Sequence, residues 1–286
     1  MKPGKTVIYS FFLGGLLALI AQAILAIWQA LLTGTPMSFF IGGATLVSMG
    51  IIGCVLGGLA IYQYFEEWAT FGALLPFSGF AMAVGMKMLG PWTTQNASTG
   101  KSVWQGAWLV IWFNVVGAVS CILFGFICTK AGIQPALSAE KTTGGLLFPY
   151  AFLMGGILCA LFQLCYLGAK KMTPKAKPVW ILMFAWCMGA IIAPCGLGTV
   201  LMNVFGEGFA VMIPVGGYNM YNVGAAFAIG ESAEALVHLG SFMLAVFGLF
   251  FTGLATYGIY RAKFGRDTIH EVHLQKAKDA VAKLEG

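Results

Sequence analysis

Residues 69–89 read ATFGALLPFSGFAMAVGMKML, and residues 208–230 read GFAVMIPVGGYNMYNVGAAFAIG. Each segment is apolar and contains a Pro-x-x-Gly motif near its middle, beginning at Pro76 and at Pro214. Proline lacks an N–H and glycine lacks a side chain, so this motif interrupts a helix. At membrane depth the freed backbone groups must face protein or a water-filled cavity. The two segments therefore predict helices that are broken inside the membrane.

The composition of the whole chain is that of an integral membrane protein. Its 286 residues include 16 Lys+Arg and 10 Asp+Glu, a net charge of +6. Charged residues make up 9% of the chain, against about 25% in a soluble domain, and the mean hydropathy is +0.86. We therefore predict an all-α polytopic membrane protein in the lipid bilayer. The sequence contains no nucleophile–base pair, phosphate loop or metal cluster, so it predicts no enzyme, cofactor, metal site or nucleic-acid partner.

Loop charges predict how the chain crosses the membrane. Six uninterrupted apolar stretches are long enough to span, at 6–32, 37–65, 104–129, 144–169, 178–205 and 235–260. If the two broken segments return to the side they came from, 11 basic residues lie on one side and 2 on the other. If both segments cross, the same 13 residues divide 7 against 6. The positive-inside rule favours six spans plus two re-entrant hairpins, with both termini cytoplasmic in the cell (inner) membrane.

The chain also repeats itself. Tyr9 to Gly15 parallels Tyr150 to Gly156 at an offset of 141, and Pro76 parallels Pro214 at an offset of 138. Each repeat has three spans, which cross the membrane, and one hairpin, which does not. Because three is odd, the second repeat starts on the opposite side from the first. This predicts inverted repeats whose hairpins meet near the midplane. The expected division is 1–133 for the first membrane repeat, 134–265 for the second and 266–286 for a tail.

Gln22 and Gln163 occupy matching positions in the first helix of each repeat. A carboxamide in lipid must find a partner. The functional interpretation is that both line a solute path. The alternative is an interhelical hydrogen bond of about 0.6 kcal/mol.

The breaks themselves predict the path. A half-helix that begins at a break turns its positive dipole end to the midplane, which favours anionic or dipolar solutes. The alternative is a simple kinked helix. Besides the two glutamines, the predicted path residues are Pro76, Ser78, Gly79, Phe80, Pro214, Gly216, Gly217, Tyr218, Asn219 and Asn222.

Three further polar features lie near or beyond the second break. Glu234 and His238 are four residues apart, so they share a helix face and are candidates for a proton relay; the alternative is a solvated interfacial pair. Asn114 is a lone polar residue in a span, either pore-facing or bonded to a neighbouring helix. The tail, residues 266–286, predicts a cytoplasmic amphipathic helix. It contacts the body, a cytoplasmic partner, another copy of the chain or, through Lys276, Lys278 and Lys283, the membrane surface.

The motifs carry a family resemblance. Gly14-Gly15 followed by Gln22, Thr35-Pro36, and the FGALLPFSGF sequence from Phe71 to Phe80 resemble the stage V sporulation membrane proteins of the SpoVAC/SpoVAE type. The resemblance covers residues 6–265 as two family units in one chain. Lys101-Ser102 stands where the family usually has an acidic Glu-Gly. The resemblance implies a solute-conducting membrane protein, since family members are implicated in passage of dipicolinic acid and in channel behaviour.

Two function classes follow from these observations. The first is a transporter or channel for a small organic, anionic solute, with its path between the two hairpins. The second is a non-transporting membrane subunit that anchors a larger complex. Within the first class, the repeats suit alternating access, whereas the resemblance favours a channel.

Overall fold

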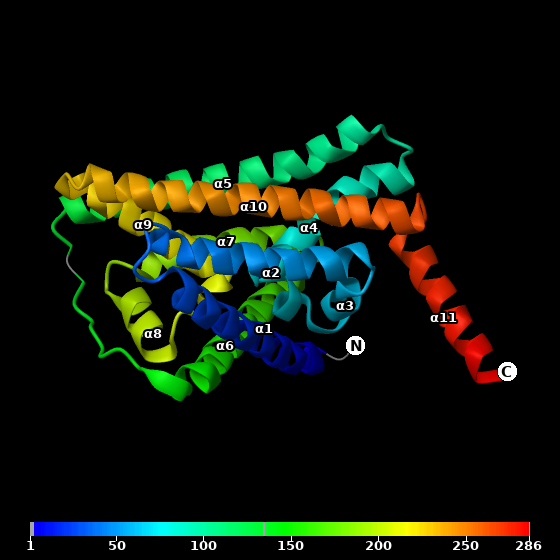
Figure 1. Cartoon of the computed structure of the whole chain (residues 1–286), viewed down its shortest axis with the longest axis horizontal. Helices are drawn as coiled ribbons and strands as arrows, with labels where there is room; N and C mark the ends of the chain where they lie inside the picture. Colours follow the sequence, from blue (N-terminus) through cyan, green and yellow to red (C-terminus); the bar gives the residue numbers. More distant parts are fainter. Residues whose placement is uncertain (1–2, 134, 286) are drawn as a thin grey trace.

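The computed structural model describes residues 3–133 and 135–285, and all of its elements are helices. The first half contains α1 (Pro3–Leu32), η1 (Ser38–Phe40), α2 (Ile41–Gly58), α3 (Tyr62–Leu74), α4 (Phe77–Thr94) and α5 (Thr99–Lys130). The second half contains η2 (Gly144–Leu146), α6 (Leu147–Met172), α7 (Pro178–Ile192), α8 (Leu197–Phe205), η3 (Gly208–Val211), α9 (Ile213–Ile229) and α10 (Ser232–Phe264). The chain ends in α11 (Ile269–Glu285), and both termini lie at the same end of the helix bundle (Figure 1).

The expected membrane spans are largely present. Five helical segments are long and apolar enough to cross a bilayer by themselves: Pro3–Leu32, Ser38–Gly58, Thr99–Lys130, Gly144–Met172 and Ser232–Phe264. A sixth candidate is the pair α7 and α8, which is bent by 100°. The prediction of an all-α polytopic membrane protein is confirmed.

Two predicted span boundaries were wrong. The span drawn at 37–65 ends with α2 at Gly58, because the chain turns at Ala60, whose φ is +55°, and starts α3 at Tyr62. The span drawn at 178–205 breaks after α7, where Gly196 adopts φ +82°. Residues 197–205 therefore form a separate short helix that leads towards the second break.

Helix contacts pair corresponding elements of the two halves. Helices α1 and α6 pack against each other through their Gly-Gly motifs. A Cβ added to Gly14 would lie 2.2 Å from Cys159 Sγ, and one added to Gly155 would lie 2.4 Å from Ala18 Cβ. Elsewhere α4 packs on α10 as α9 packs on α5, and α2 packs on α4 as α7 packs on α9. These contacts of one half thus recur with the halves exchanged.

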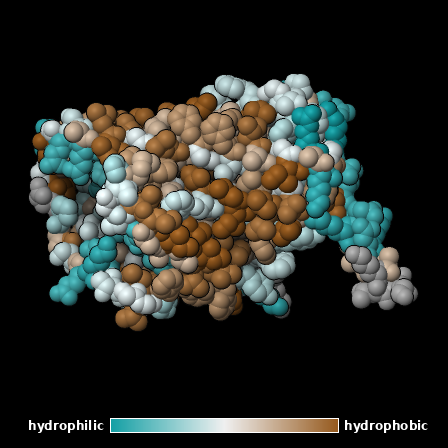
Figure 2. Space-filling view, viewed as in Figure 1, coloured by the Kyte–Doolittle hydropathy of each residue, from teal (hydrophilic) through white to brown (hydrophobic). Residues whose placement is uncertain are grey.

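The outer surface is suited to lipid. Large apolar side chains such as Phe12, Trp108 and Phe251 are more than half exposed. Figure 2 shows that the face in view is apolar over its middle and hydrophilic at the two ends of the bundle. Because a bilayer has an apolar core between two polar surfaces, this distribution fits a protein embedded with its long helices across the membrane.

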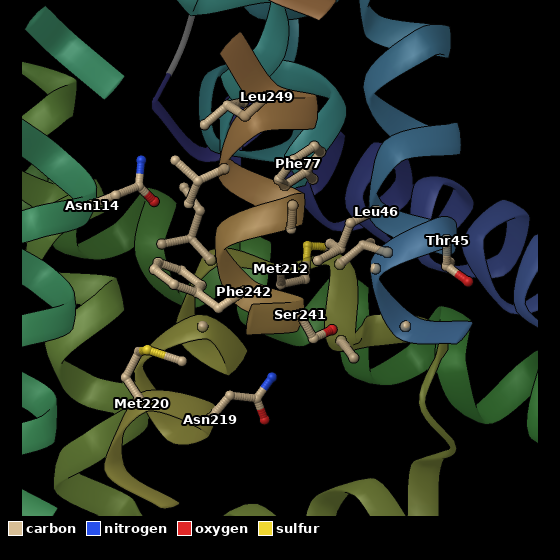
Figure 3. A pocket seen from close by; sticks show the side chains of 18 of the residues that line it. Thr45, Leu46, Phe77, Asn114, Met212, Asn219, Met220, Ser241, Phe242 and Leu249 are labelled. Atoms are coloured by element: carbon tan, nitrogen blue, oxygen red, sulfur yellow. The ribbon is translucent and has the colours of Figure 1, made fainter. Parts of the chain in front are cut away.

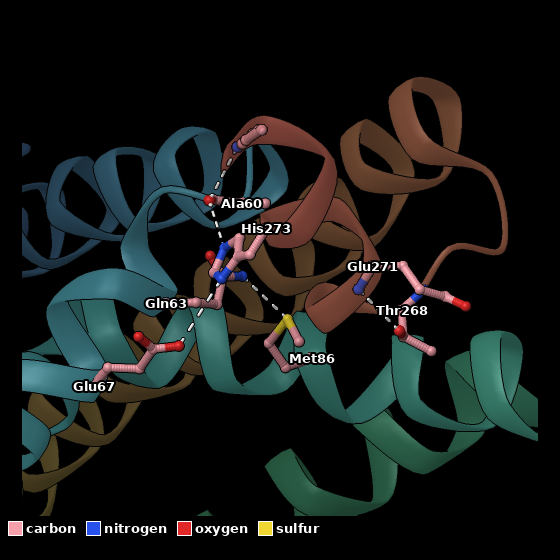
Figure 4. A network of polar contacts seen from close by, with 8 residues as sticks. Ala60, Gln63, Glu67, Met86, Thr268, Glu271 and His273 are labelled. Carbon is pink, nitrogen blue, oxygen red and sulfur yellow. Dashed lines mark hydrogen bonds and ion pairs between the residues drawn. The ribbon is translucent and has the colours of Figure 1, made fainter. Parts of the chain in front are cut away.

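The C-terminal helix projects from one end of the bundle but is bonded to it near its start (Figures 1 and 4). Lys276 Nζ donates to the carbonyls of Leu59 and Ala60, at 2.9 and 3.2 Å. His273 donates from Nε2 to Ala60 O at 3.1 Å, and its ring stacks on Tyr64 with centroids 3.9 Å apart. These bonds satisfy carbonyls that α2 leaves free where it ends.

The first turn of α11 is capped by its own side chains. The backbone N–H of Thr268 donates to Glu271 Oε2 at 2.6 Å, and the N–H of Glu271 donates to Thr268 Oγ1 at 3.3 Å. This reciprocal pair is a capping box. The bond from Thr268 lowers the pKa of the Glu271 carboxyl. The predicted helical tail is thus present, with its N-terminal turn fixed.

Candidate functional site

The two Pro-x-x-Gly breaks meet in the interior. Pro76 and Met212 form an isolated antiparallel bridge, and the N–H of Ile213 donates to Leu75 O at 3.1 Å. Both Pro76 and Met212 have extended backbone just before a helix, with ψ of 152° and 141°. The helix after the second break therefore begins before Pro214, whereas the helix after the first break begins after Pro76. The structural counterpart of Pro76 is thus Met212, two residues before the Pro214 that the sequence repeat indicates.

Gln22 and Gln163 each form a hydrogen bond to the backbone near the break in the other half of the chain. Gln22 Oε1 accepts the N–H of Gly208 at 2.8 Å, and Gln163 Oε1 accepts the N–H of Phe71 at 3.1 Å. Both side chains are buried. Ser10 Oγ also donates to Gln163 Oε1 at 3.3 Å. The two carboxamides thus bond to backbone at the start of each hairpin, and neither lines the cavity described below.

Gly79 and Gly217 are needed for close packing. Both lie in regular helix, without a positive φ. A Cβ on Gly79 would lie 1.7 Å from Ala73 O, and one on Gly217 would lie 1.9 Å from Trp186 O. Such distances are impossible without moving the backbone. Any larger residue would therefore push the helix after each break away from its neighbour.

A tyrosine hydroxyl bonds to a small hydroxyl side chain beside each break. Tyr62 and Ser78 are 2.9 Å apart through their hydroxyl oxygens, and Tyr62 also donates to Ala73 O at 3.0 Å. At the second break, Tyr218 and Thr199 are 2.7 Å apart. Ser78 is fully buried. The bond from Tyr62 satisfies the carbonyl of Ala73 at the first break, while the other two bonds join side chains.

A cavity of about 290 Å³ leads from one end of the bundle to these breaks. Along α10 it extends from His238 to Leu249, which is about 16 Å of helix. Its inner part is lined by Phe77, Met212 and Ile213, the residues at the breaks (Figure 3). A ligand cavity of this kind normally has apolar walls with a few polar groups.

Four of the predicted site residues line this cavity, namely Phe80, Gly216, Asn219 and His238. Pro214 and Tyr218 instead line a second cavity of about 30 Å³, bounded by α6, α7, α8 and α9. The remaining predicted residues line neither cavity: Gln22, Gln163, Pro76, Ser78, Gly79, Gly217, Asn222 and Glu234.

Sequence reasoning missed most of the cavity wall. Trp186 on α7, Ser241 and Phe242 on α10, and Thr45 on α2 all line it. Asn114 on α5 also lines it, so of its two interpretations the pore-facing one fits the cavity. A lone amide in an apolar span was a usable signal. A serine or phenylalanine in such a span was not, because both are common there.

Charged groups lie at the mouth of the cavity. Glu207 is 3.3 Å from Lys141 Nζ, and His238 Nε2 is 3.6 Å from Glu234 Oε1 with both side chains more than half exposed. The neighbouring Glu234 carboxyl raises the pKa of Glu231. The proton relay through Glu234 and His238 stays a prediction. Of the two residues, only His238 contacts the cavity.

The interior of the cavity has no basic side chain among its described lining residues. A helix N-terminus stabilises an anion by about 0.3–1 kcal/mol, and by at most about 2 kcal/mol when partly buried. Removing an ion from water costs several kcal/mol. The starts of α4 and α9 therefore offset only part of the cost of bringing a permanent anion to the breaks.

The fold and the cavity define a polytopic α-helical membrane protein with a cavity that leads from one end of the bundle to the junction of its two halves. Residues 6–129 match the SpoVAC/SpoVAEB sporulation membrane protein family. The family resemblance is thus confirmed over the first half of the chain, whereas the fusion of two such units stays a prediction. Neither the curated proteins nor the solved structures contain a match to this chain.

Proposed function

We propose that the protein moves a small organic solute across the membrane through the cavity that ends at the two breaks. The observation that carries this proposal is the cavity itself, because about 290 Å³ of space runs from the bundle's end to the bridge between Pro76 and Met212. A non-transporting anchor has no use for such a space at the junction of its two halves. Interior packing is normally dense, with few voids larger than a water molecule.

The same proposal includes inverted repeats with re-entrant hairpins. Three features support it: the reciprocal bonds of Gln22 and Gln163, the antiparallel bridge at the breaks, and helix contacts that recur with the halves exchanged. In this arrangement the cavity opens on the extracytoplasmic side, where Lys141 and Glu207 lie. The termini and α11 lie in the cytoplasm.

A conformational step completes the proposed path. On the other side of the breaks the side chains are close-packed, and Tyr62, Phe71 and Met82 are at most 1% exposed. The described conformation is therefore open on one side and closed on the other. A carrier would alternate this closure between the two sides, and a channel would open the closed side while keeping the cavity.

The test is flux in reconstituted vesicles with a plugged cavity. Ser241→Trp places an indole inside the cavity, and Leu244→Trp places the same group on the exposed face of the same helix, one turn away. A panel of small carboxylates, amides and amino acids is loaded, and release is followed. Loss of flux only in Ser241→Trp supports the proposal. Equal flux in both variants, or no solute released by the unaltered protein, contradicts it and favours the anchor subunit.

A further inference from the structure

The wall of the cavity presents polar atoms that the described residues do not use. Asn114 donates one Nδ2 hydrogen to Val110 O at 2.8 Å, which leaves Oδ1 and the second Nδ2 hydrogen without a partner among the described residues. The side chains of Asn219 and Ser241 also line the cavity and have no hydrogen bond to other described residues. Figure 3 shows the three side chains on different helices around the space. The carboxamides of Asn114 and Asn219 and the hydroxyl of Ser241 are thus free to bind a solute.

The remaining inner wall is aromatic. Phe113 does not line the cavity but packs against two rings that do. Its ring centroid lies 4.6 Å from that of Phe80 and 5.5 Å from that of Trp186. Trp186 in turn meets Phe242 edge to face at 5.8 Å and 80°. Rings held in this way present flat faces and edges at fixed positions. Such a wall favours a flat ring over a flexible chain, because aromatic pairs prefer offset-stacked or edge-to-face contact.

The charge of the lining is the third observation. Glu207, at the mouth, is the acidic residue among the described lining residues, and it is paired with Lys141. Asn114 Oδ1 accepts a hydrogen bond that an amide or hydroxyl can donate and that a carboxylate cannot. An uncharged solute is also spared the cost of leaving water as an ion.

We infer that the cavity takes an uncharged solute consisting of a flat ring with a hydrogen-bond donor, such as an aromatic amide or phenol. This inference rests on the proposed function and replaces the anionic class suggested by the helix dipoles and by the family resemblance. Asn114 Oδ1 receives the donor, Asn219 and Ser241 bind the solute's remaining polar groups, and the ring lies against Phe80, Trp186 and Phe242.

The test compares solutes that share a ring and differ in charge. Benzamide with benzoate, and nicotinamide with nicotinate, are measured by calorimetry on the purified full-length protein in nanodiscs at pH 7. We expect each amide to bind at least about tenfold more tightly than its carboxylate. Cyclohexanecarboxamide, which is not flat, should bind more weakly than benzamide.

Variants locate the binding. Asn114→Leu should remove the preference for the amide, while Gln105→Leu, on the same helix but outside the cavity lining, should keep it. Ser241→Ala, a smaller change, should weaken amide binding in the same direction. Tighter binding of the carboxylates would overturn the inference and leave the transport proposal standing. Binding by neither member of a pair would overturn the inference, and vesicles that release no solute of the wider panel would overturn the transport proposal as well.

Discussion

Gln22 and Gln163 each accept a backbone hydrogen bond from the opposite half of the chain, close to the break in that half. The donors are Gly208 and Phe71, and the bonds are 2.8 and 3.1 Å long. Both glutamines had two interpretations from sequence, a path lining and a structural bond. The contacts support the structural bond, and they give it a specific role, which is to hold the hairpin of the other half in place.

Replacing either glutamine should therefore destabilise the protein. Gln22→Leu and Gln163→Leu each leave a buried N–H without a partner, which costs about 1–3 kcal/mol. Thermal unfolding in detergent, followed by light scattering or intrinsic fluorescence, measures this loss. Gln105→Leu, at a half-buried position on α5, is the matched control and should change little. Unchanged stability in both variants, together with lost flux, would restore the path interpretation.

Adjacent glycines at the second break should respond differently to the same methyl group. Gly217→Ala would place a Cβ 1.9 Å from Trp186 O, so we expect little folded protein. Gly216→Ala would meet its nearest atom, in the Trp186 ring, at 3.3 Å and should fold. Yield of monodisperse protein on size-exclusion chromatography measures both. Equal yields would mean that α9 can shift away from α7 at no cost.

The bonds from α11 should protect the turn between α2 and α3. Lys276→Ala removes the donor to Leu59 and Ala60, so hydrogen exchange at residues 59–64 should accelerate. Lys278→Ala, an exposed lysine on the same helix, is the control. Truncation after Arg266 should accelerate exchange further while transport continues, because the cavity lies at the other end of the bundle. Loss of transport on truncation would show that the tail controls the path.

The capping box of α11 should give this docking a pH dependence. Its hydrogen bonds lower the pKa of Glu271 below the ordinary value of 4.5. The stabilisation is therefore complete above that ordinary value and is lost as the pH falls through the lowered one. Hydrogen exchange at residues 268–272 between pH 6 and pH 3 measures the loss, after correction for intrinsic rates. Glu271→Gln should flatten this dependence, and an unaltered profile would mean that the box contributes nothing.

Thiol labelling should establish the orientation. On a cysteine-free background, Lys141→Cys should react with an impermeant reagent added outside intact cells, and Lys175→Cys should react only after the cells are opened. The reason is the bias of basic loops to the cytoplasm. Outside labelling at position 175 would contradict the six-span topology.

The sequence predicted the elements whose signals are local. Long apolar stretches gave the spans, and Pro-x-x-Gly gave both breaks. It also paired Gln22 with Gln163 through their offset, although not with Gly208 and Phe71. The bend after α7 was missed because residues 178–205 stay apolar through Pro194 and Gly196, which only in retrospect mark it.

The cavity could not be predicted in the same way. Its wall combines residues from nine separate elements, and Ser241 or Phe242 becomes a lining residue only because α10 packs against α9. Hydrophobicity alone does not distinguish a face that contacts lipid from one that contacts a cavity. In membrane helices both faces are apolar, so the periodic pattern that identifies a buried face in soluble proteins is weak.

The reciprocal glutamine bonds also bear on how such a chain could have arisen. Each half carries the group that completes the other, so neither half is expected to fold when produced alone. Two halves made as separate polypeptides, cut within residues 135–143, should still find each other and reassemble. A single ancestral unit could have met the same requirement by pairing with a second copy of itself, and joining two genes would then have preserved an assembly that already existed.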